Sequence, residues 1–459
     1  MRNKLIPLIV VMFALLASCQ PKVIYKYNYY SVPVLAPGVS PEMNTAGFWI
    51  GLHPDPDALI MAEDEIADFN EYIIKKTKAV RDIRKLSATR DGRSLSGSLK
   101  QMLDQNKGYV DSRGEKMSKE YISGMDALMG ADKLLKTIAA QWAFVVSPAD
   151  QRLLPITKPL YKSATDTGID RLQNNALDVA TPVLVLTEST DHKWFYVISP
   201  NSEGWLLSEK VAFCTKEEMD WYEEYGPKAV AVEAKVDLFA DPWLRQHLAY
   251  MQMGCVLPLL GMCDNSSIQV LVPVRKDDGW CAFIPAYTSA ADMNQGYLPY
   301  TPRTALVQAF KLLNAPYGWG GMHGEQDCSR FVQEVFATMG IVLPRNSSQQ
   351  GRVGRLISSF NAADKQSERQ AMLAKSAMGG ITTLQFPGHI MLYLGSIGGR
   401  PYAIHDLYAY AEPASEDERL VPMNRVVVSS LALGEGTKKG PFIMRLGNVR
   451  EVSPEPSAE

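Results

Sequence analysis

The sequence has no hydrophobic run long enough to cross a membrane. Its longest apolar run extends from Leu5 to Leu16, whereas a membrane-spanning helix needs about 20 apolar residues. A large excess of one charge is also missing, because the net charge is −3 over 459 residues and no basic run stands out. Nucleic-acid binding depends on clustered lysine and arginine side chains. We therefore expect no nucleic-acid partner.

The N-terminal apolar run is typical of an export signal. A short basic region, Met1 to Lys4, precedes it, and Leu16-Ala17-Ser18-Cys19 ends it. These last four residues resemble the bacterial lipobox. That resemblance implies that residues 1–19 are a lipoprotein signal peptide and that a lipid on Cys19 anchors the protein to a membrane of the cell envelope. In a Gram-negative cell this is the periplasmic face of the outer membrane. An ordinary secretory signal with an incidental cysteine is the alternative.

Cysteine is scarce, and its spacing does not match a metal site. The chain has six cysteines and six histidines, with no C-x-x-C or H-E-x-x-H pattern. We expect no metal and no organic cofactor. Apart from Cys19 and Cys328, four cysteines remain that an exported chain can oxidise, and the sequence does not choose among their three possible pairings: Cys214, Cys255, Cys263 and Cys281.

Cys328 has the position of a nucleophile. It follows a glycine-rich turn, and apolar residues recur after it at helical spacing from Phe331 to Met339. This pattern predicts a helix that begins at Cys328. The amide hydrogens and positive dipole end of a helix N-terminus favour thiolate over thiol. The alternative is a small buried cysteine without a chemical role.

Two histidines are expected to meet on a β-hairpin. Residues 388–394 and 401–405 read as strands, with turn residues between them. A hairpin centred on Ile397 places His389 directly opposite His405, with both side chains on one face. His389 then serves as base for Cys328, and His405 orients His389. Alternation turns Asp406 to the other face. A structural histidine pair and a zinc site that includes His323 are the alternatives.

Residues 301–450 resemble the catalytic domain of the NlpC/p60 superfamily of bacterial cell-wall cysteine peptidases. The resemblance runs in order through residues 315–321, 327–329, 343–347 and 388–395 and ends at His405. It implies a papain-like α+β core with Cys328, His389 and His405 as catalytic residues. It also implies hydrolysis of the bond between the γ-carboxyl of D-glutamate and a diamino acid, usually meso-diaminopimelate. Arg330 stands where the family commonly has glycine, which leaves the substrate preference open.

Three further residues are candidates for substrate binding. Asp327 is a favoured N-cap residue, and in related peptidoglycan-recycling enzymes the matching aspartate is implied to bind the free amine of an N-terminal L-alanine. The Tyr317 hydroxyl is expected near the developing oxyanion, although an aromatic residue in such a turn often only packs. Arg345 either pairs with the α-carboxylate of D-glutamate or is a surface arginine at a helix end.

The rest of the chain reads as a series of small units. Residues 57–76 and 121–135 have helical patterns, with Asp55 or Asp57 as cap of the first. Strand patterns that resemble bacterial SH3-like barrels follow twice, and Trp194, Tyr196 and Trp205 belong either to the barrel core or to a wall of the cleft. The expected parts are a tether (20–40), a helical stabilising or clip segment (41–140), two SH3-like barrels (141–215 and 216–300), the peptidase domain (301–450) and a tail (451–459).

These patterns predict an α+β protein in which a papain-like domain follows two all-β barrels and a helical segment. The predicted function is that of a lipid-anchored cysteine endopeptidase that cuts L-Ala-γ-D-Glu-diamino-acid stem peptides through a thioacyl intermediate on Cys328. In related multidomain peptidases the first barrel closes over the cleft, which favours released muropeptides with a free N-terminal L-alanine. An envelope-binding scaffold with little or no peptidase activity, and an amidase or acyltransferase on the same core, are the alternatives.

Overall fold

The computed structural model describes residues 35–263, 265–414 and 417–455. The predicted signal peptide with Cys19, residues 20–34 of the predicted tether and residues 456–459 of the predicted tail lie outside these ranges. In the part of the chain that is described, no helix is long and apolar enough to cross a membrane. The expected α+β class is confirmed, because helices and three larger antiparallel sheets alternate along the chain.

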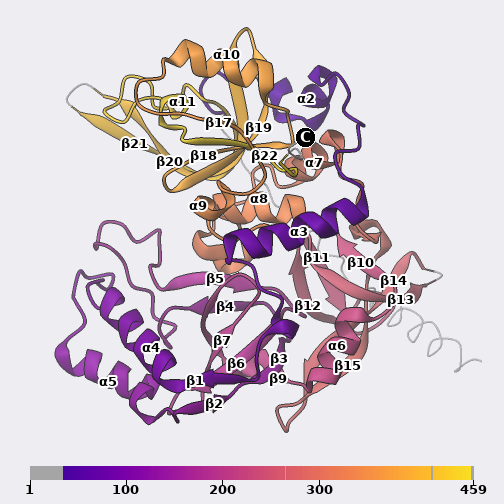
Figure 1. Cartoon of the computed structure of the whole chain (residues 1–459), viewed down its shortest axis with the longest axis vertical. Helices are drawn as coiled ribbons and strands as arrows, with labels where there is room; N and C mark the ends of the chain where they lie inside the picture. The colour runs from indigo at the N-terminus through magenta and orange to yellow at the C-terminus, as the bar shows by residue number, and fades with distance from the viewer. Residues whose placement is uncertain (1–34, 264, 415–416, 456–459) are drawn as a thin grey trace, which may run out of the picture. The chain divides into compact units, whose positions relative to one another are not determined.

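The N-terminal part is helical, but its helices differ from the predicted ones (Figure 1). The first predicted helix begins only at Glu63, after Ala62, so neither Asp55 nor Asp57 caps it. Asp57 lies in a turn and is bound by Arg303, and the Ile60 N–H donates to the Tyr300 carbonyl, so tertiary contacts hold this stretch outside the helix. The elements are η1 (Pro41–Asn44), α2 (Ala46–Leu52), α3 (Glu63–Thr77), η2 (Ile83–Lys85), β1 (Thr89–Asp91), α4 (Gly92–Asn106), α5 (Lys119–Met129), η3 (Ala131–Lys133) and β2 (Thr137–Ala139).

A seven-stranded antiparallel sheet, here named barrel 1, follows. Trp194, Tyr196 and Trp205 are 6%, 1% and 0% exposed and lie in its core, so the idea that they form a wall of the cleft is wrong. The strand order is β5-β4-β8-β7-β6-β3-β9. Its elements are β3 (Gln141–Val145), β4 (Ala149–Arg152), β5 (Gln173–Leu177), β6 (Pro182–Glu188), β7 (Trp194–Ile198), β8 (Glu203–Leu207), η4 (Ser208–Lys210) and β9 (Val211–Phe213).

A second seven-stranded sheet, barrel 2, shares its core with barrel 1. Phe144 of barrel 1 packs against Tyr222 and Phe283, with ring centroids 4.9 and 5.8 Å away. The five described cysteines are all free thiols. The strand order is β12-β11-β15-β14-β13-β10-β16. The elements are α6 (Lys216–Glu224), β10 (Lys228–Ala231), β11 (Lys235–Phe239), β12 (His247–Gln252), β13 (Val256–Met262), β14 (Ser267–Arg275), β15 (Cys281–Ser289), η5 (Ala290–Asp292) and β16 (Met293–Gln295).

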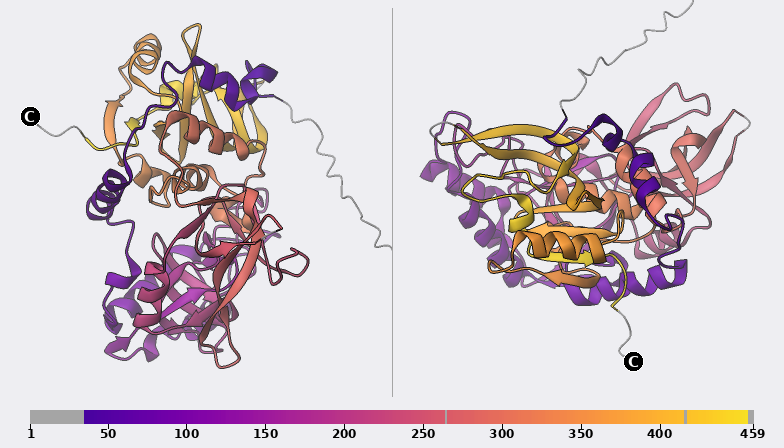
Figure 2. Two further views of the ribbon diagram at one scale, coloured as in Figure 1. Left: turned by 90° about the vertical axis from the view of Figure 1, so that its right-hand side faces the viewer. Right: turned by 90° about the horizontal axis from the view of Figure 1, so that it is seen from above.

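The C-terminal part is a six-stranded sheet of order β17-β22-β18-β19-β20-β21 between two layers of helices (Figures 1 and 2). Helices α7 and α8 pack on one face and share a core with Ile390. Helices α10 and α11 cover the other face, with Leu373 and Phe442 against Met391. The elements are α7 (Pro302–Lys311), η6 (Trp319–Gly324), α8 (Cys328–Ala337), α9 (Ser347–Gln350), β17 (Arg355–Ser359), α10 (Gln366–Ser376), β18 (Thr382–Phe386), β19 (His389–Ile397), β20 (Arg400–Pro413), β21 (Glu418–Ser430), α11 (Phe442–Arg445) and β22 (Asn448–Glu451).

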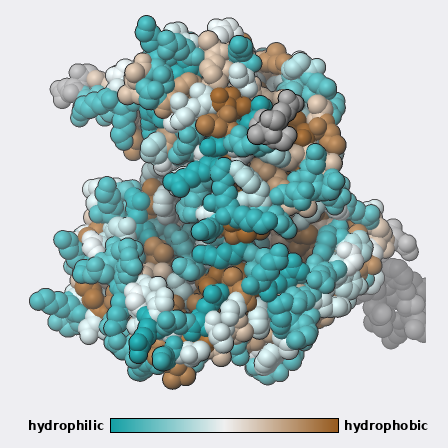
Figure 3. Space-filling view, in the orientation of Figure 1, coloured by the Kyte–Doolittle hydropathy of each residue, from teal (hydrophilic) through white to brown (hydrophobic). Residues whose placement is uncertain are grey.

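Two segments expected to be unstructured are in fact packed. Ala36 is buried, and the Tyr402 hydroxyl donates to the Gly38 carbonyl, so residues 35–40 lie against the C-terminal sheet rather than in a tether. Glu451 ends β22 and Val452 is buried, so the predicted tail begins too early. The face in Figure 3 is mostly hydrophilic, and its hydrophobic side chains lie in small separate groups.

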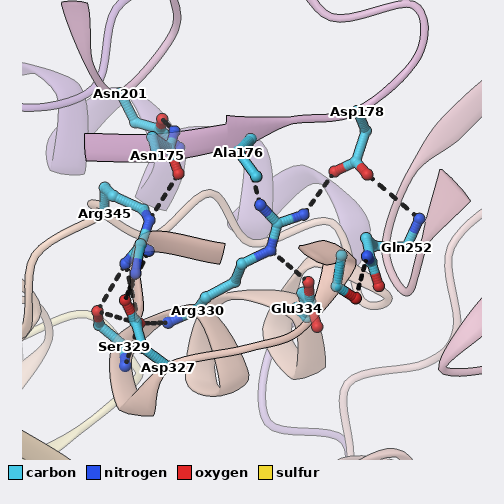
Figure 4. Close-up of polar contacts among 12 residues, drawn as sticks. Asn175, Ala176, Asp178, Asn201, Gln252, Asp327, Ser329, Arg330, Glu334 and Arg345 are labelled. Carbon is cyan, nitrogen blue, oxygen red and sulfur yellow. Dashed lines mark hydrogen bonds and ion pairs between the residues drawn. The ribbon is translucent and has the colours of Figure 1, made fainter. Parts of the chain in front are cut away.

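Arg330 joins the C-terminal part to barrel 1 (Figure 4). Its guanidinium donates to the Ala176 carbonyl at 2.6 Å and to the Asp178 carboxylate at 2.9 Å, while its Nε donates to Glu334 at 2.6 Å. Asp178 also accepts the backbone N–H of Gln252 from barrel 2. Arg330 and Glu334 are buried. One guanidinium thus ties the first turns of α8 to the end of β5, where Asp178 also binds Gln252 of barrel 2.

Replacing Arg330 should destabilise the whole described fold. In Arg330→Met, Glu334 is left buried without its ion-pair partner and must take up a proton, and Asp178 loses its partner too; breaking such a buried pair costs about 3–5 kcal/mol of unfolding free energy. Urea unfolding followed by circular dichroism measures the loss. The double variant R330M/E334L removes the stranded acid as well and should recover much of the stability. A loss below about 1 kcal/mol in R330M would show that this ion pair contributes little to holding the parts together.

Candidate active site

Cys328 is the first residue of α8 and lies at the end of the sheet where β19 begins. Asp327 caps the helix, as predicted, by accepting the N–H groups of Ser329 and Arg330. The preceding turn, η6, contains Gly320 and Gly321 in the left-handed region with φ of 63° and 81°. Cys328 is 7% exposed. The backbone N–H of Ile390, the neighbour of His389, faces its sulfur.

The expected thiolate is not the resting form of Cys328. Burial raises the pKa of the thiol to about 12, and the charge of Asp327 adds to this rise, while the Ile390 N–H lowers it in part. The prediction counted the N-terminal amides as free donors. Asp327 occupies two of them and brings a negative charge beside the sulfur. Burial and the cap together outweigh the helix dipole.

His389 and His405 are in contact, as predicted. His389 Nε2 lies 2.7 Å from His405 Nδ1, and His405 Nε2 lies 2.8 Å from Ser429 Oγ. The predicted register is wrong, because Ile397 pairs with Arg400 across a two-residue turn and Leu392 pairs with Ile404. This register sets His405 across from Met391, so the two histidines meet as diagonal neighbours on one face.

The histidine pair is neutral at rest. Burial lowers the pKa of His389 to about 3 and holds the pKa of His405 well below its usual range. Both hydrogen bonds are satisfied if Nε2–H of His389 donates to His405 and Nε2–H of His405 donates to Ser429. Nδ1 of His389 is then left as an acceptor. Among the described residues, no hydrogen bond joins Cys328 to His389.

Two phenylalanine side chains, Phe386 of β18 and Phe442 of α11, pack against the histidine rings. The centroid of Phe386 lies 5.2 Å from His389, and that of Phe442 lies 6.0 Å from His405. Within the described ranges, no group of three or more His, Cys, Asp or Glu side chains is arranged to hold a metal ion. The rings are therefore oriented by their mutual hydrogen bond and by aromatic packing.

Arg345 is buried and bound to Asp327, so the alternative of a surface arginine is wrong (Figure 4). Its Nη1 and Nη2 donate to the two oxygens of Asp327 at 3.0 and 2.7 Å, and Nη1 also reaches the Ser329 hydroxyl at 2.8 Å. Its Nε donates to Asn175 of barrel 1 at 2.6 Å. Despite burial, Arg345 keeps the pKa of Asp327 below its ordinary value. Both charges are matched within the protein.

Tyr317 lies close to the nucleophile. Burial raises the pKa of its hydroxyl far above the usual range, and the charges of Asp327 and Cys328 raise it further. Its ring packs against Tyr408, with centroids 5.5 Å apart. Gly168 of barrel 1 approaches this pair so closely that a side-chain carbon there would lie 2.4 Å from the Tyr408 hydroxyl. Barrel 1 therefore reaches the aromatic pair beside Cys328.

Sequence reasoning missed the residues that barrel 1 contributes to this site. Asn175 binds Arg345, Asp178 binds Arg330, and Arg171 places its guanidinium 5.5 Å from the Trp319 ring. They lie more than a hundred residues before their partners, so no local spacing relates them. One signal was present. A cluster of polar residues, Gln173 to Asn175, is unusual for a strand and marks an edge that meets another polar surface.

Comparison with known proteins gives partial matches. Residues 314–410 match the NlpC/P60 family, and residues 159–207 match an SH3 domain of the SH3b1 type. A γ-D-glutamyl-L-lysine dipeptidyl-peptidase of Bacillus cereus is 27% identical over 41% of this chain and 56% of its own length. A bifunctional muramidase/DL-endopeptidase of Bacillus subtilis is 29% identical over 28% of this chain and 38% of its own length. The chain thus covers less than two thirds of either relative.

A solved structure of an NlpC/P60 endopeptidase from Photobacterium damselae shares the fold. The TM-score is 0.75 at 17% sequence identity, and the match covers 93% of this chain and 100% of that one. The likeness extends over most of the chain and concerns the fold alone. The match to the NlpC/P60 family spans the residues that hold Cys328, His389 and His405, and the match to the SH3 domain lies before it in the same chain.

Proposed function

We propose that this protein is a cysteine endopeptidase of the peptidoglycan-hydrolase type that cuts the bond between γ-D-glutamate and a diamino acid in stem peptides. The observation that carries the proposal is the chain of hydrogen bonds from His389 through His405 to Ser429, set beside a cysteine at a helix N-terminus. A nucleophile, a base and a group that orients the base are the parts that acyl transfer requires.

In the proposed reaction, His389 Nδ1 takes the proton of the Cys328 thiol as its sulfur attacks the γ-carbonyl of D-glutamate. The amide bond breaks, and the imidazolium returns this proton to the leaving amine. Water then hydrolyses the thioester with His389 as base. His405 keeps the ring in place through the 2.7 Å bond to Nε2. Because the Cys328 thiol and His389 are both neutral at rest, the thiolate–imidazolium pair forms only during the reaction. The Tyr317 hydroxyl and the Cys328 N–H then face the oxyanion.

We propose released stem peptides as the substrate. Barrel 1 supports this because Gly168 lies against Tyr408, which packs on Tyr317, and Arg171 lies against Trp319. A muramyl sugar attached to the peptide would meet barrel 1 there. The relatives are named for D-glutamyl-L-lysine and DL-endopeptidase activities, which supports a diamino acid after the scissile bond. The substrate implies an extracytoplasmic site of action, with the lipid anchor on Cys19 as a further part of this proposal.

Asp327 enters this proposal in a changed role. Six donors surround its carboxylate: two from Arg345, three from Ser329 and Arg330, and the Gly320 N–H. A substrate amine therefore meets a carboxylate whose charge is already matched. Asp327 and Arg345 serve first to fix the start of α8 against barrel 1. We propose that selection for a free N-terminus comes mainly from the space that barrel 1 leaves, with little contribution from the Asp327 charge.

Purified protein should release L-Ala-D-Glu from L-Ala-γ-D-Glu-meso-diaminopimelate. Mass spectrometry of the products measures this, with the L-lysine peptide and the peptide still joined to muramic acid alongside. Cys328→Ala should abolish release, and His389→Ala should lower it by about 10²–10⁴-fold. Cleavage of the free peptides alone supports a recycling endopeptidase.

Other outcomes have definite meanings. Equal cleavage of the muramyl-linked peptide contradicts the exclusion by barrel 1, while the catalytic proposal stands. New bonds between two peptides, instead of hydrolysis, point to acyl transfer. If the folded protein cuts none of the three peptides, the peptidase proposal fails for this substrate class and the alternative of an envelope-binding scaffold replaces it. The Cys328→Ala protein will then behave identically.

Alkylation of Cys328 by iodoacetamide should be slow at neutral pH and rise with pH through the alkaline range. The reason is that burial raises the thiol pKa to about 12, so little thiolate exists at pH 7. Peptide mass spectrometry measures the rate at this residue, and the exposed part of Cys263 gives an internal comparison. A rate that is already at its plateau below pH 7 would reveal a thiolate–imidazolium pair and contradict the neutral resting state.

A further inference from the structure

Ser429 is a polar residue at a position where the sheet is otherwise apolar. Val427 and Leu431, two residues before and after it, share its face of β21 and belong to the apolar core beneath α10 and α11. Ser429 itself is 0% exposed. An apolar side chain would fill such a place without the cost of burying a hydroxyl, which has to be hydrogen-bonded. The serine therefore calls for a partner.

That partner is His405. Ser429 Oγ lies 2.8 Å from His405 Nε2, and among the described residues the serine hydroxyl has no other hydrogen bond. His405 pairs with Val427 in the strand register, so Ser429 is its diagonal neighbour on the same face. His389 is its diagonal neighbour on the other side, with Nε2 2.7 Å from His405 Nδ1. The three side chains thus form one polar row across β19, β20 and β21.

The hydrogen bonds of this row can run in either of two directions. In the first, His389 Nε2–H donates to His405 and His405 Nε2–H donates to Ser429, which leaves His389 Nδ1 as an acceptor. In the second, Ser429 donates, His405 donates from Nδ1, and His389 carries its own proton on Nδ1. Only the first direction leaves His389 able to take a proton from Cys328. Both rings are neutral at rest, because burial lowers the pKa of His389 to about 3 and that of His405 well below its usual range.

The charged state of the reaction allows the first direction alone. An imidazolium at His389 carries a proton on each nitrogen, so its Nε2–H has to donate and His405 Nδ1 has to accept. The proton of the neutral His405 ring then lies on Nε2 and faces the Ser429 oxygen. Without that oxygen, this N–H is a buried donor with no partner, which is unfavourable. The acceptor at the end of the row is therefore needed when the charge forms.

We propose that Ser429 is a positioning residue of the active site: its oxygen accepts the Nε2–H of His405 and so holds both histidines in the tautomers that leave His389 Nδ1 free to act as base. This inference rests on the proposed peptidase function. Ser429 acts through His405, because the two hydrogen bonds of the row connect it to the base. A hydroxyl ends the row without adding a negative charge, as a carboxylate would, so the histidine pair stays neutral until Cys328 gives up its proton.

Nuclear magnetic resonance tests the tautomers without any need for activity. Long-range proton–nitrogen spectra of the full chain with isotope-labelled histidine should show the Nε2–H tautomer for His389 and His405, whose signals are assigned from their alanine variants. Ser429→Val should reverse the row and move both protons to Nδ1, because a buried N–H without an acceptor costs more than a bare lone pair. Ser429→Thr, which has the shape of valine and keeps the hydroxyl, should show the wild-type tautomers. Nδ1–H tautomers in the wild type, or unchanged tautomers in S429V, overturn the proposal.

Kinetics of the same matched pair test the role in the reaction. S429V should lose about 10–100-fold in kcat with little change in KM, because its His405 N–H is stranded only as the charge forms, and S429T should restore most of this rate. Melting temperatures show that the variants fold, and Ser429→Ala should repeat the loss without added volume. An S429A or S429V protein with full kcat overturns the proposal, as does a folded S429T protein as slow as S429V. If the wild type cuts no peptide while S429V reverses the tautomers, the failure lies with the peptidase function.

Discussion

The salt bridge between Asp327 and Arg345 is the interaction on which the site depends. Asp327 caps α8 and so fixes the residue that follows it, Cys328, at the end of the sheet. Arg345 then holds Asp327 from the far side and extends to Asn175 of barrel 1. Because both partners are buried, each charge needs the other, and removing either strands the second. One pair of charges thereby joins the start of α8 to barrel 1.

Barrel 1 is consequently part of the site and not only a neighbour of it. Arg330, in the place where glycine is common in the family, reaches Asp178 and Ala176, parallel to the bond from Arg345 to Asn175 (Figure 4). The guanidinium groups of Arg345 and Arg330 bind the second half of β5 and the residue after it, and so hold the barrel against the first turns of α8. Since these contacts are short and buried, the barrel cannot move without disturbing the helix that carries the thiol. Arg330 thus adds a second link between α8 and barrel 1, beside the one that Arg345 makes.

Features that depend on residues close together in the sequence were predicted correctly. The helix from Cys328, its aspartate cap and the histidine contact follow from spacing and alternation, and all three are found. The predictions were wrong where contacts between distant residues decide the backbone conformation, the strand register or the burial of a side chain. Residues 57–62 are held outside the helix by contacts with Arg303 and Tyr300, a two-residue turn shifts the hairpin register, and Arg345 is bound by a partner 170 residues away. The prediction that Cys328 rests as a thiolate was wrong for the same reason. The burial that raises the pKa of the thiol depends on the fold as a whole.

The neutral state of the thiol follows from the same burial and has a chemical advantage. The thiolate, not the thiol, is the form that oxidants and other electrophiles attack. A cysteine that is 7% exposed, with a pKa near 12, keeps little thiolate at rest. Under the proposed function the protein acts outside the cytoplasm, where oxidising conditions readily attack a nucleophile with a low pKa. If the charge pair forms only when a peptide lies over Cys328 and His389 receives its proton, reactivity is confined to the moment of catalysis. The burial that makes Cys328 a weak nucleophile at rest then also protects its sulfur from oxidants.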